Sequence, residues 1–210
     1  MKTLKINEIF SSVQGEGVNA GKTAIFLRLA GCNRKCDFCD TSHQEISELD
    51  VFLLAQTLSD IYQGEQLIVI TGGEPTLQNE GLFILTDIIN EFLPRAEIEL
   101  ETNGSNEVLK GYDYISLSPK QSLSETVVKE CTSLKLIYPL QTSESLLDWQ
   151  DHIKADRYYL QIKTPPGFRD GGGIEGGMRV NLFDAARKLK SCKGNKFQIT
   201  FQNHRLWRMK

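Results

Sequence analysis

Short β-type runs alternate with segments of helical period along most of the 210-residue chain. The runs that predict strands are residues 24–29, 67–71, 97–101, 114–117, 134–138, 158–162 and 197–201. Strands that alternate with helices indicate an α/β fold with a mostly parallel sheet, either open or curled into a barrel. Linkers such as the one around 105–111 are too short for a full helix, so the outer layer is expected to be incomplete. The pattern therefore favours a partial β/α barrel.

Four segments between these runs have helical character. An amphipathic stretch from about Glu48 to Tyr62 predicts a helix, with Ser47 and Asp50 as its capping box. Further helical segments lie near Ser143–Ile153 and Arg179–Ser191. In the remaining segment, one helical face is expected to carry Leu82, Leu85, Ile89 and Phe92.

Clusters of polar residues follow the predicted strands at the point where each strand ends. In chain order these clusters are Cys32, Gly72-Gly73-Glu74-Pro75, Thr102-Asn103-Gly104, Ser118-Pro119-Lys120, Gln161 and Gln202-Asn203-His204. The carboxyl ends of parallel strands share one edge of a sheet or barrel, and active sites are built there. We therefore expect these clusters to meet in one site.

Bulk properties restrict the class of protein. The length suits one domain over residues 1–210, and 40% hydrophobic with 24% charged residues is ordinary for a globular protein. A formal net charge of −3 argues against wholesale nucleic-acid binding. No apolar run approaches the ~18 residues of a membrane span, and the N-terminus lacks the apolar region of a signal peptide. A cytoplasmic protein without a membrane or nucleic-acid partner is expected.

The loop Val13–Thr23 reads VQGEGVNAGKT and ends in the Gly-Lys-Thr of a phosphate-binding loop. The Walker pattern needs a glycine five residues before Gly21, but that position is Glu16. A carboxylate at the mouth of the loop would also repel phosphate oxygens. The loop is therefore expected to serve another ligand. A second glycine-rich stretch, residues 170–177, is interpreted as a flexible surface loop, with a lid over the site as the alternative.

Three of the five cysteines lie in one loop with C-x3-C-x2-C spacing, at Cys32, Cys36 and Cys39. Such clustering indicates metal or redox chemistry rather than disulfides in a reducing compartment. A zinc site would need a fourth ligand, for which His43 is a candidate, and an ordinary ferredoxin cluster would need a fourth cysteine. The third option is a [4Fe–4S] cluster on three cysteines with one iron open. Cys131 and Cys192 are interpreted as packed or partly exposed side chains.

This C-x3-C-x-aromatic-C loop, followed after the next strand by Gly72-Gly73-Glu74-Pro75, resembles the radical S-adenosylmethionine (SAM) superfamily. The resemblance implies a partial barrel of that type, a [4Fe–4S] cluster on the three catalytic cysteines, and SAM on the open iron. Reductive cleavage of SAM would yield a 5′-deoxyadenosyl radical. The residues it implies for SAM binding are Phe38, Cys39, Asp40, Gly73, Ser118, Pro119 and Lys120.

Within that superfamily the chain is more specifically similar to the 7-carboxy-7-deazaguanine synthases. The motifs that carry this similarity are INEIF, VQGEG, GKTAIFLRLAGC, CDT, TGGEP, ETNG, LSPK and QNHR. The similarity implies conversion of 6-carboxy-5,6,7,8-tetrahydropterin to 7-carboxy-7-deazaguanine with loss of ammonia, in 7-deazapurine (queuosine) biosynthesis. It also implies Mg²⁺ on Thr41, although Asp40 is a tempting ligand. The implied substrate contacts are Val13, Gln14, Gly15, Glu16, Arg28, Thr71 and the carboxylate of Lys210.

The chain departs from that family pattern in two places. It reads Leu160-Gln161-Ile162-Lys163 where many members read Leu-Gln-Pro, and it ends on Lys210 where members often end on proline. Family analogy further implies a homodimer and an electron donor such as flavodoxin or ferredoxin. Two rival functions remain at this point. One is a glycyl-radical activating enzyme, and the other is an iron–sulfur electron carrier or zinc-stabilised scaffold without SAM cleavage.

Overall fold

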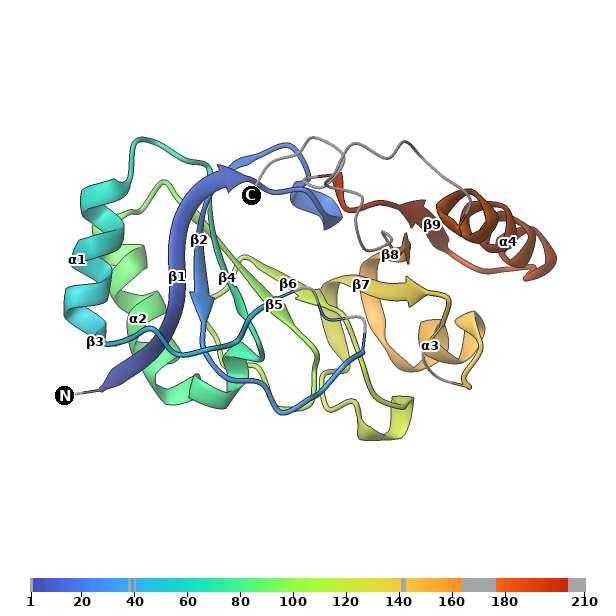
Figure 1. Cartoon of the computed structure of the whole chain (residues 1–210), viewed down its shortest axis with the longest axis horizontal. Coiled ribbons are helices and arrows are strands. Elements are labelled where there is room, and N and C mark those ends of the chain that lie inside the picture. Colours follow the sequence, from blue (N-terminus) through green and yellow to red (C-terminus); the bar gives the residue numbers. More distant parts are fainter. Residues whose placement is uncertain (1, 38, 40, 141–142, 164–176, 204–210) are drawn as a thin grey trace.

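The computed structural model describes residues 2–37, 39, 41–140, 143–163 and 177–203. All strands join one nine-stranded sheet in the order β3-β1-β2-β4-β5-β6-β7-β8-β9 (Figure 1). The strands are β1 (Thr3–Val13), β2 (Thr23–Leu29), β3 (Ser47–Asp50), β4 (Leu67–Gly72), β5 (Glu97–Thr102), β6 (Tyr114–Leu117), β7 (Glu130–Tyr138), β8 (Lys154–Ile162) and β9 (Phe197–Thr200).

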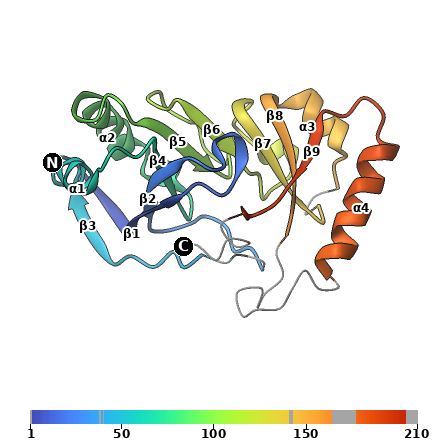
Figure 2. The same cartoon turned by 90° about the horizontal axis from the view of Figure 1, so that it is seen from above.

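The seven strands from β2 to β9 in this order pair in parallel, whereas β1 pairs antiparallel with both β2 and β3. The sheet stays open, with β3 and β9 at its edges, and it curves when seen from above (Figure 2). The predicted fold class, an incomplete and mostly parallel β/α barrel, is confirmed. Strand β1 was not predicted, because its alternation breaks: Ile6 and Asn7 are both buried, where the register with β2 shifts.

The α-helices are α1 (Val51–Ile61), α2 (Asn79–Phe92), α3 (Leu146–His152) and α4 (Gly177–Ser191). Helices α1 and α2 cover one end of the sheet, and α3 and α4 lie at the other end (Figure 1). No α-helix occurs between β5 and β6 or between β6 and β7, connections that the structure describes completely; the second holds only the 3₁₀ turn η3 (Leu123–Glu125). The predicted gap in the outer layer is therefore present. Among the described residues, no helix has both the length and the apolar character to cross a membrane.

Two details of the predicted helices were wrong. The first helix begins at Val51 rather than near Glu48, because Ser47–Asp50 are extended and pair with β1 as strand β3. Its N-cap is Asp50 alone, whose carboxylate accepts from the Phe52 N–H at 2.9 Å, so Ser47 takes no part in a capping box. On α2, Leu82, Leu85 and Ile89 of the predicted helical face are buried, and Phe92 is half exposed at the C-terminal end of the helix.

Alternation along each strand divides the side chains between two faces of the sheet. On β2, Ile25, Leu27 and Leu29 pack into the core beneath α1 and α2, as do Ile68 and Ile70 of β4. The intervening residues Ala24, Phe26, Leu67 and Val69 form a separate apolar cluster on the opposite, inner face, where Phe26 stacks on Phe10 with ring centroids 5.0 Å apart. A second core under α3 and α4 contains Leu134, Leu136, Leu160 and Ile162. The same alternation decides which polar residues face inward.

Candidate active site

Inward positions near the carboxyl ends of the strands are polar rather than apolar. They alternate with the core residues of their own strands, so they are directed away from the helices. These inward polar residues are Arg28 on β2, Thr71 on β4, Glu99 and Glu101 on β5, Ser116 on β6, Ser133 and Lys135 on β7, and Gln161 on β8. Strand parity thus lines one face of the sheet with hydrogen-bonding and charged groups.

A cavity of about 560 Å³ opens over this face. Twelve of the residues that the sequence predicts for the site line it: Val13, Gln14, Glu16, Arg28, Cys32, Cys36, Cys39, Thr41, Thr71, Gly73, Ser118 and Lys120. The predicted meeting of the strand-end clusters in one place is therefore present in the structure. Gly15 and Pro119 are not among the lining residues; both are buried, and the Gly15 carbonyl accepts from the Asn203 N–H at 3.1 Å. Phe38, Asp40, His204, Lys210 and the stretch 170–176 lie outside the described residues.

The loop between β1 and β2 folds over the inner face and places Gln14 among carboxylates. The Gln14 Nε2 donates to Glu99 at 3.3 Å and to Glu101 at 3.2 Å, and its Oε1 accepts from the backbone N–H of Glu16 at 3.1 Å. Asn19 also donates to Glu99, at 3.0 Å. These contacts fix the orientation of the Gln14 amide, which is 2% exposed. The loop is thus a preformed part of the cavity wall.

Two carboxylates on β5 differ in their surroundings. Glu101 lines the cavity and accepts from the Thr71 hydroxyl at 2.8 Å. Glu99 lies behind it and is 1% exposed. Burial, together with the Glu101 carboxylate, raises the pKa of Glu99 to about 7, against which the hydrogen bonds from Asn19 and Gln14 act. The pair therefore holds less than two full negative charges near neutral pH.

Arg28 approaches the cavity from the other side of the mouth. Its Nε donates to Glu8 at 2.8 Å, across the antiparallel pair of β1 and β2. The guanidinium also lies over the Phe10 ring, 5.8 Å from its centroid. With Nε engaged by Glu8, the guanidinium end of Arg28 is held toward the cavity, and its planar fork suits a carboxylate ligand.

The three clustered thiols lie on one wall of the same cavity. Burial raises the pKa of both Cys32 and Cys36, and each is also raised by the charge of Cys39 nearby. Cys39 Sγ is 3.2 Å from His43 Nε2. Within the described part of the chain, no three Cys, His, Asp or Glu side chains are already close enough to hold a metal ion.

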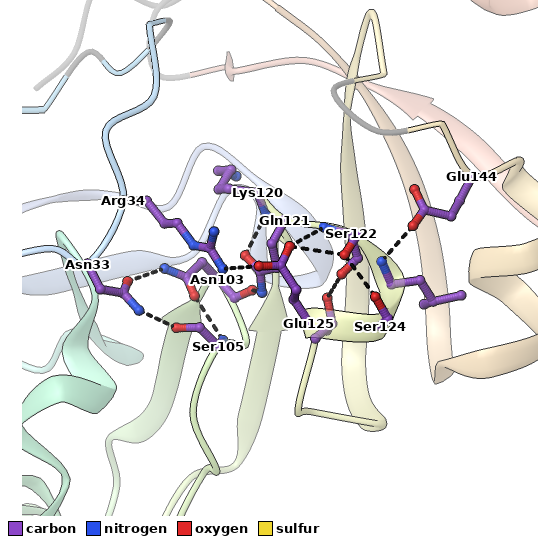
Figure 3. A network of polar contacts seen from close by, with 12 residues as sticks. Asn33, Arg34, Asn103, Ser105, Lys120, Gln121, Ser122, Ser124, Glu125 and Glu144 are labelled. Atoms are coloured by element: carbon purple, nitrogen blue, oxygen red, sulfur yellow. Dashed lines mark hydrogen bonds and ion pairs between the residues drawn. The ribbon is translucent and has the colours of Figure 1, made fainter.

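Neighbouring loops anchor the cysteine loop (Figure 3). The Asn33 side chain donates to Ser105 Oγ at 2.7 Å and accepts from the Asn103 amide at 3.0 Å. Arg34 pairs with Glu125 at 3.7 Å. The Asn103 carbonyl in turn accepts from Gln121 at 2.8 Å. The loops after β5 and β6 therefore hold the cysteine loop at the edge of the sheet.

The two glycines after β4 allow the closest approach to this loop. A Cβ on Gly73 would lie 2.0 Å from the Gly31 carbonyl oxygen and 2.7 Å from the Cys32 Cβ. Gly72 has a φ of +145°, and a Cβ there would meet the Leu29 carbonyl oxygen at 2.3 Å. Only glycine fits both positions, because the chain there packs directly against the backbone that leads into the cysteine loop.

Lys120, after β6, lies near the thiols on the cavity wall. Its Nζ donates to Ser118 Oγ, so the two predicted SAM-binding side chains touch. Burial and the nearby Lys135 charge lower the pKa of Lys120 to about 8, while Glu16, Cys36 and Glu101 act in the opposite direction. An anionic group bound nearby would favour the charged form of the Lys120 side chain.

Similarity to known proteins distinguishes between the alternative functions. The sequence profile described as the Radical SAM superfamily matches residues 27–137, more than half of the chain. A 7-carboxy-7-deazaguanine synthase of Bacteroides thetaiotaomicron is 32% identical over 75% of this chain and 80% of its own. One of Burkholderia multivorans is 33% identical over 79% of this chain and 84% of its own. The chain belongs to the 7-carboxy-7-deazaguanine synthase family of the radical SAM superfamily.

Other relatives extend the match over nearly the whole chain. The 7-carboxy-7-deazaguanine synthase of Haemophilus influenzae is 28% identical over 96% of this chain and 92% of its own. The crystal structure of QueE from Escherichia coli superposes with a TM-score of 0.67 at 21% identity, over 96% of this chain and 95% of that one. That structural likeness shows the fold. Membership of the family, shown by the sequence matches, replaces the electron-carrier and zinc-scaffold alternatives.

A [4Fe–4S] cluster and SAM are the cofactors of this superfamily, and the cavity fits them. The three thiols, the two glycines and Lys120 all line this cavity. His43, the candidate fourth zinc ligand, contacts Cys39. Cys131 is buried and Cys192 is partly buried, as predicted for two packing residues.

Sequence reasoning missed several polar residues of the site. They are Asn19, Glu99, Glu101 and Lys135. Alternation along the strands could have found the last three, whereas Asn19 lies in the loop between β1 and β2. In EIELET, glutamates alternate with core residues of a strand whose apolar side packs under helices, so the glutamates must face inward. Gln161, predicted as a strand-end residue, is 4% exposed and lines the cavity, and its Oε1 has no hydrogen-bond partner among the described residues.

Proposed function

We propose that the chain is a 7-carboxy-7-deazaguanine synthase, a radical SAM carbon–nitrogen lyase. Its substrate would be 6-carboxy-5,6,7,8-tetrahydropterin, which undergoes ring contraction with loss of ammonia. The observation that carries the proposal is that three clustered thiols and the carboxylates of Glu16 and Glu101 line one cavity. A family relationship to proteins of this name, from several organisms, agrees with it.

The chemistry of the cavity suits the two ends of the proposed substrate. The aminopyrimidinone edge of a pterin presents N–H donors, and Glu16 and Glu101 offer charge-assisted acceptors for them. Arg28 offers a planar fork to the substrate carboxylate. Thr71 and Gln14 hold the Glu101 carboxylate in place, so both residues orient the acceptor wall. The volume of the cavity falls within the ordinary range for small-ligand sites.

Cysteines 32, 36 and 39 would hold the cluster, and the glycines after β4 with Ser118 and Lys120 would hold SAM. Bound there, the two cofactors supply the 5′-deoxyadenosyl radical that abstracts hydrogen from the substrate carbon bearing the carboxylate. The protein's part is to keep that carbon close to the cofactor and to exclude water. The apolar pair Phe10 and Phe26, which also lines the cavity, serves the second task.

Three further components belong to the same proposal. Thr41 lines the cavity and would provide an oxygen ligand for Mg²⁺, with substrate and water filling the other positions. A homodimer and a one-electron donor such as flavodoxin or ferredoxin follow from family analogy. Phe38, Asp40 and the carboxylate of Lys210 remain predicted ligand contacts outside the described residues.

Product formation tests the proposal directly. The protein is reconstituted with iron and sulfide under anaerobic conditions. It is then incubated with SAM, a strong reductant, Mg²⁺ and 6-carboxy-5,6,7,8-tetrahydropterin. We expect 7-carboxy-7-deazaguanine and ammonia in equal amounts, with a matched reaction lacking reductant as the control. Cluster-loaded protein that cleaves SAM but forms no deazaguanine would refute the assigned substrate and leave the superfamily assignment intact.

A further inference from the structure

An ion pair inside the cavity joins two segments that are distant in sequence. Lys135 Nζ on β7 donates to the Glu16 carboxylate in the loop between β1 and β2. The side chains are only 8% and 10% exposed, and both residues line the cavity. By contrast, the Lys154–Glu130 pair between β8 and β7 is 78% and 72% exposed. The buried pair is therefore shielded from solvent and from salt.

Lys135 is surrounded by more negative than positive charge. Burial alone would lower its pKa, but Glu16, Glu101 and Glu99 outweigh burial and raise the pKa of the Lys135 ammonium. Among the residues that the structure describes, Lys120 is a second cation that interacts with Lys135, Glu16 and Glu101. Glu16 belongs to the loop after β1, the other two carboxylates to β5, and Lys120 to the segment after β6. Lys135 thus provides the positive charge at the centre of three carboxylates.

The ion pair is not needed to hold the loop in position. The two ends of the loop between β1 and β2 are joined by backbone hydrogen bonds. The Gln14 N–H donates to the Lys22 carbonyl at 2.9 Å, and the Gly21 N–H donates to the Gln14 carbonyl at 2.8 Å. Asn19 and Gln14 tie the loop to Glu99 on β5. What the ion pair adds is the direction and the ionised state of the Glu16 side chain.

We propose that Lys135 is a positioning residue for substrate recognition, which keeps the Glu16 carboxylate ionised and directed into the cavity so that it can accept hydrogen bonds from the pterin ring. This inference rests on the proposed function, and it adds a residue that the sequence motifs do not include. A buried carboxylate without a cation would take up a proton or turn away, and a protonated carboxyl is a poorer acceptor for ring N–H groups. Lys135 acts through Glu16, so its loss is expected to affect substrate binding first. Its charge also lowers the pKa of Lys120 at the SAM end, so SAM cleavage is measured for every variant as well.

The test compares Lys135→Met, Glu16→Gln and the double variant with wild type, all reconstituted and assayed for product. Lys154→Met, which removes the exposed pair, is the matched control. Each single variant in the cavity is expected to raise the KM for the carboxytetrahydropterin by about tenfold or more. The double variant should be no more than about twofold worse than Glu16→Gln, because both substitutions remove the same contact. Reductive cleavage of SAM without the pterin should stay within about twofold of wild type.

The pH dependence of kcat/KM separates positioning from a purely structural role. Without the ammonium, the pKa of the nearby carboxylates rises, so a larger fraction of them is protonated at pH 6. Raising the pH from 6 to 9 ionises them, and Lys135→Met should therefore regain kcat/KM over this range. Replacing Glu16 as well should abolish that gain. Lys135→Arg, which keeps the charge, should restore a KM near that of wild type. Lys135→Gln, which also removes the charge, replaces Lys135→Met in the comparison if the latter does not fold.

Three results would overturn the proposal. They are additive effects of the two substitutions, a KM for Lys135→Arg as high as that of Glu16→Gln, and equal losses of pterin turnover and SAM cleavage. Wild-type protein and Lys154→Met must form product in the same assay. If neither forms product although SAM is cleaved, it is the proposed substrate that fails, and not the role of Lys135.

Discussion

The buried carboxylate of Glu74 accepts from the backbone N–H of Asn103 at 2.7 Å, so it joins the loop after β4 to the loop after β5. Its other oxygen accepts from the Thr102 hydroxyl at 2.7 Å and from the hydroxyl and N–H of Thr76 at 2.6 and 3.1 Å. The glutamate of the GGEP motif is 0% exposed and makes no contact with the cavity. Its task is to hold together the edge of the sheet that carries the site.

Glu74→Ala leaves four buried donors without an acceptor. We expect a loss of about 3 kcal/mol of stability, which corresponds to a fall of roughly 10 °C in the midpoint of thermal unfolding. Glu74→Gln should fall between this variant and wild type, since one oxygen remains. The exposed Glu80→Gln is the control and should shift the midpoint by less than about 2 °C. A fall of less than about 3 °C for Glu74→Ala would contradict the structural role.

Gly73→Ala is expected to displace the cysteine loop, because the added methyl group would overlap the Gly31 carbonyl and the Cys32 side chain. Iron and sulfide content after reconstitution should fall well below that of wild type, and SAM cleavage should fall with it. Gly64→Ala is the matched control, since its φ of +97° strains alanine but no atom lies within 4 Å. Full cluster content in Gly73→Ala would show that the loop has room to adjust.

The order of the elements could be predicted because each parallel strand carries its own apolar signal and each is followed by a turn. Strand β1 could not, since the shift of its register near Asn7 buries two successive residues and removes the period-2 pattern. The start of α1 was placed too early because Ser47 and Asp50 both resemble caps. The competing pairing of Ser47–Asp50 with β1 is a long-range contact that local sequence does not contain.

The same distinction between local signals and long-range contacts applies to the candidate site. Its cysteines, glycines and arginine stand in short motifs, and these could be placed from sequence. Glu99 and Lys135 stand inside strands, where a charged residue usually faces water. Their burial depends on the loop between β1 and β2, which folds over the sheet, and Glu16 and Lys135 are 119 positions apart in the sequence. That relationship required the structure.

Glu99 predicts a specific pH dependence of stability. Its pKa in the folded chain is about 7, above the ordinary value of 4.5, so the folded state holds a proton that the unfolded state has already lost. This contribution to stability is complete below about pH 4.5 and is lost as the pH rises to 7, by about 3 kcal/mol at most. In Glu99→Gln, which has no titrating carboxyl at this position, this decrease in stability with pH is absent. Its unfolding midpoint relative to wild type should therefore rise between pH 5 and pH 8.

Glu97→Gln, on the same strand, is the control for that measurement. The Lys22 hydrogen bond lowers the pKa of Glu97, partly offset by its limited burial. Its contribution is therefore already present at pH 5 and is lost only at lower pH. The midpoint of Glu97→Gln relative to wild type should stay constant between pH 5 and 8. Parallel behaviour of the two variants would show that Glu99 does not hold the extra proton.

Thr41→Ala is expected to weaken the response of turnover to Mg²⁺ while the cluster stays intact. The hydroxyl is the proposed ligand, so a higher Mg²⁺ concentration should be needed for half-maximal rate. Thr41→Ser, which keeps the oxygen, should behave like wild type. Iron content and reductive SAM cleavage serve as the check that the adjacent Cys39 is undisturbed. An unchanged Mg²⁺ titration in Thr41→Ala would remove this residue from the metal site.

Arg28→Lys tests which end of the substrate lies at β2. The guanidinium is fixed by Glu8 at Nε and by the Phe10 ring, so its orientation is set before a ligand binds. Lysine keeps the charge but cannot offer two parallel donors to a carboxylate. We expect the affinity for 6-carboxy-5,6,7,8-tetrahydropterin to fall about tenfold.

The same variant should bind tetrahydropterin without the carboxylate as well as wild type does. This comparison isolates the carboxylate contact, because a general disturbance of the cavity would weaken both ligands equally. Competition against turnover measures the two affinities in one assay. Equal losses for both compounds would place Arg28 beside the ring rather than beside the carboxylate, and the substrate would then lie the other way round in the cavity.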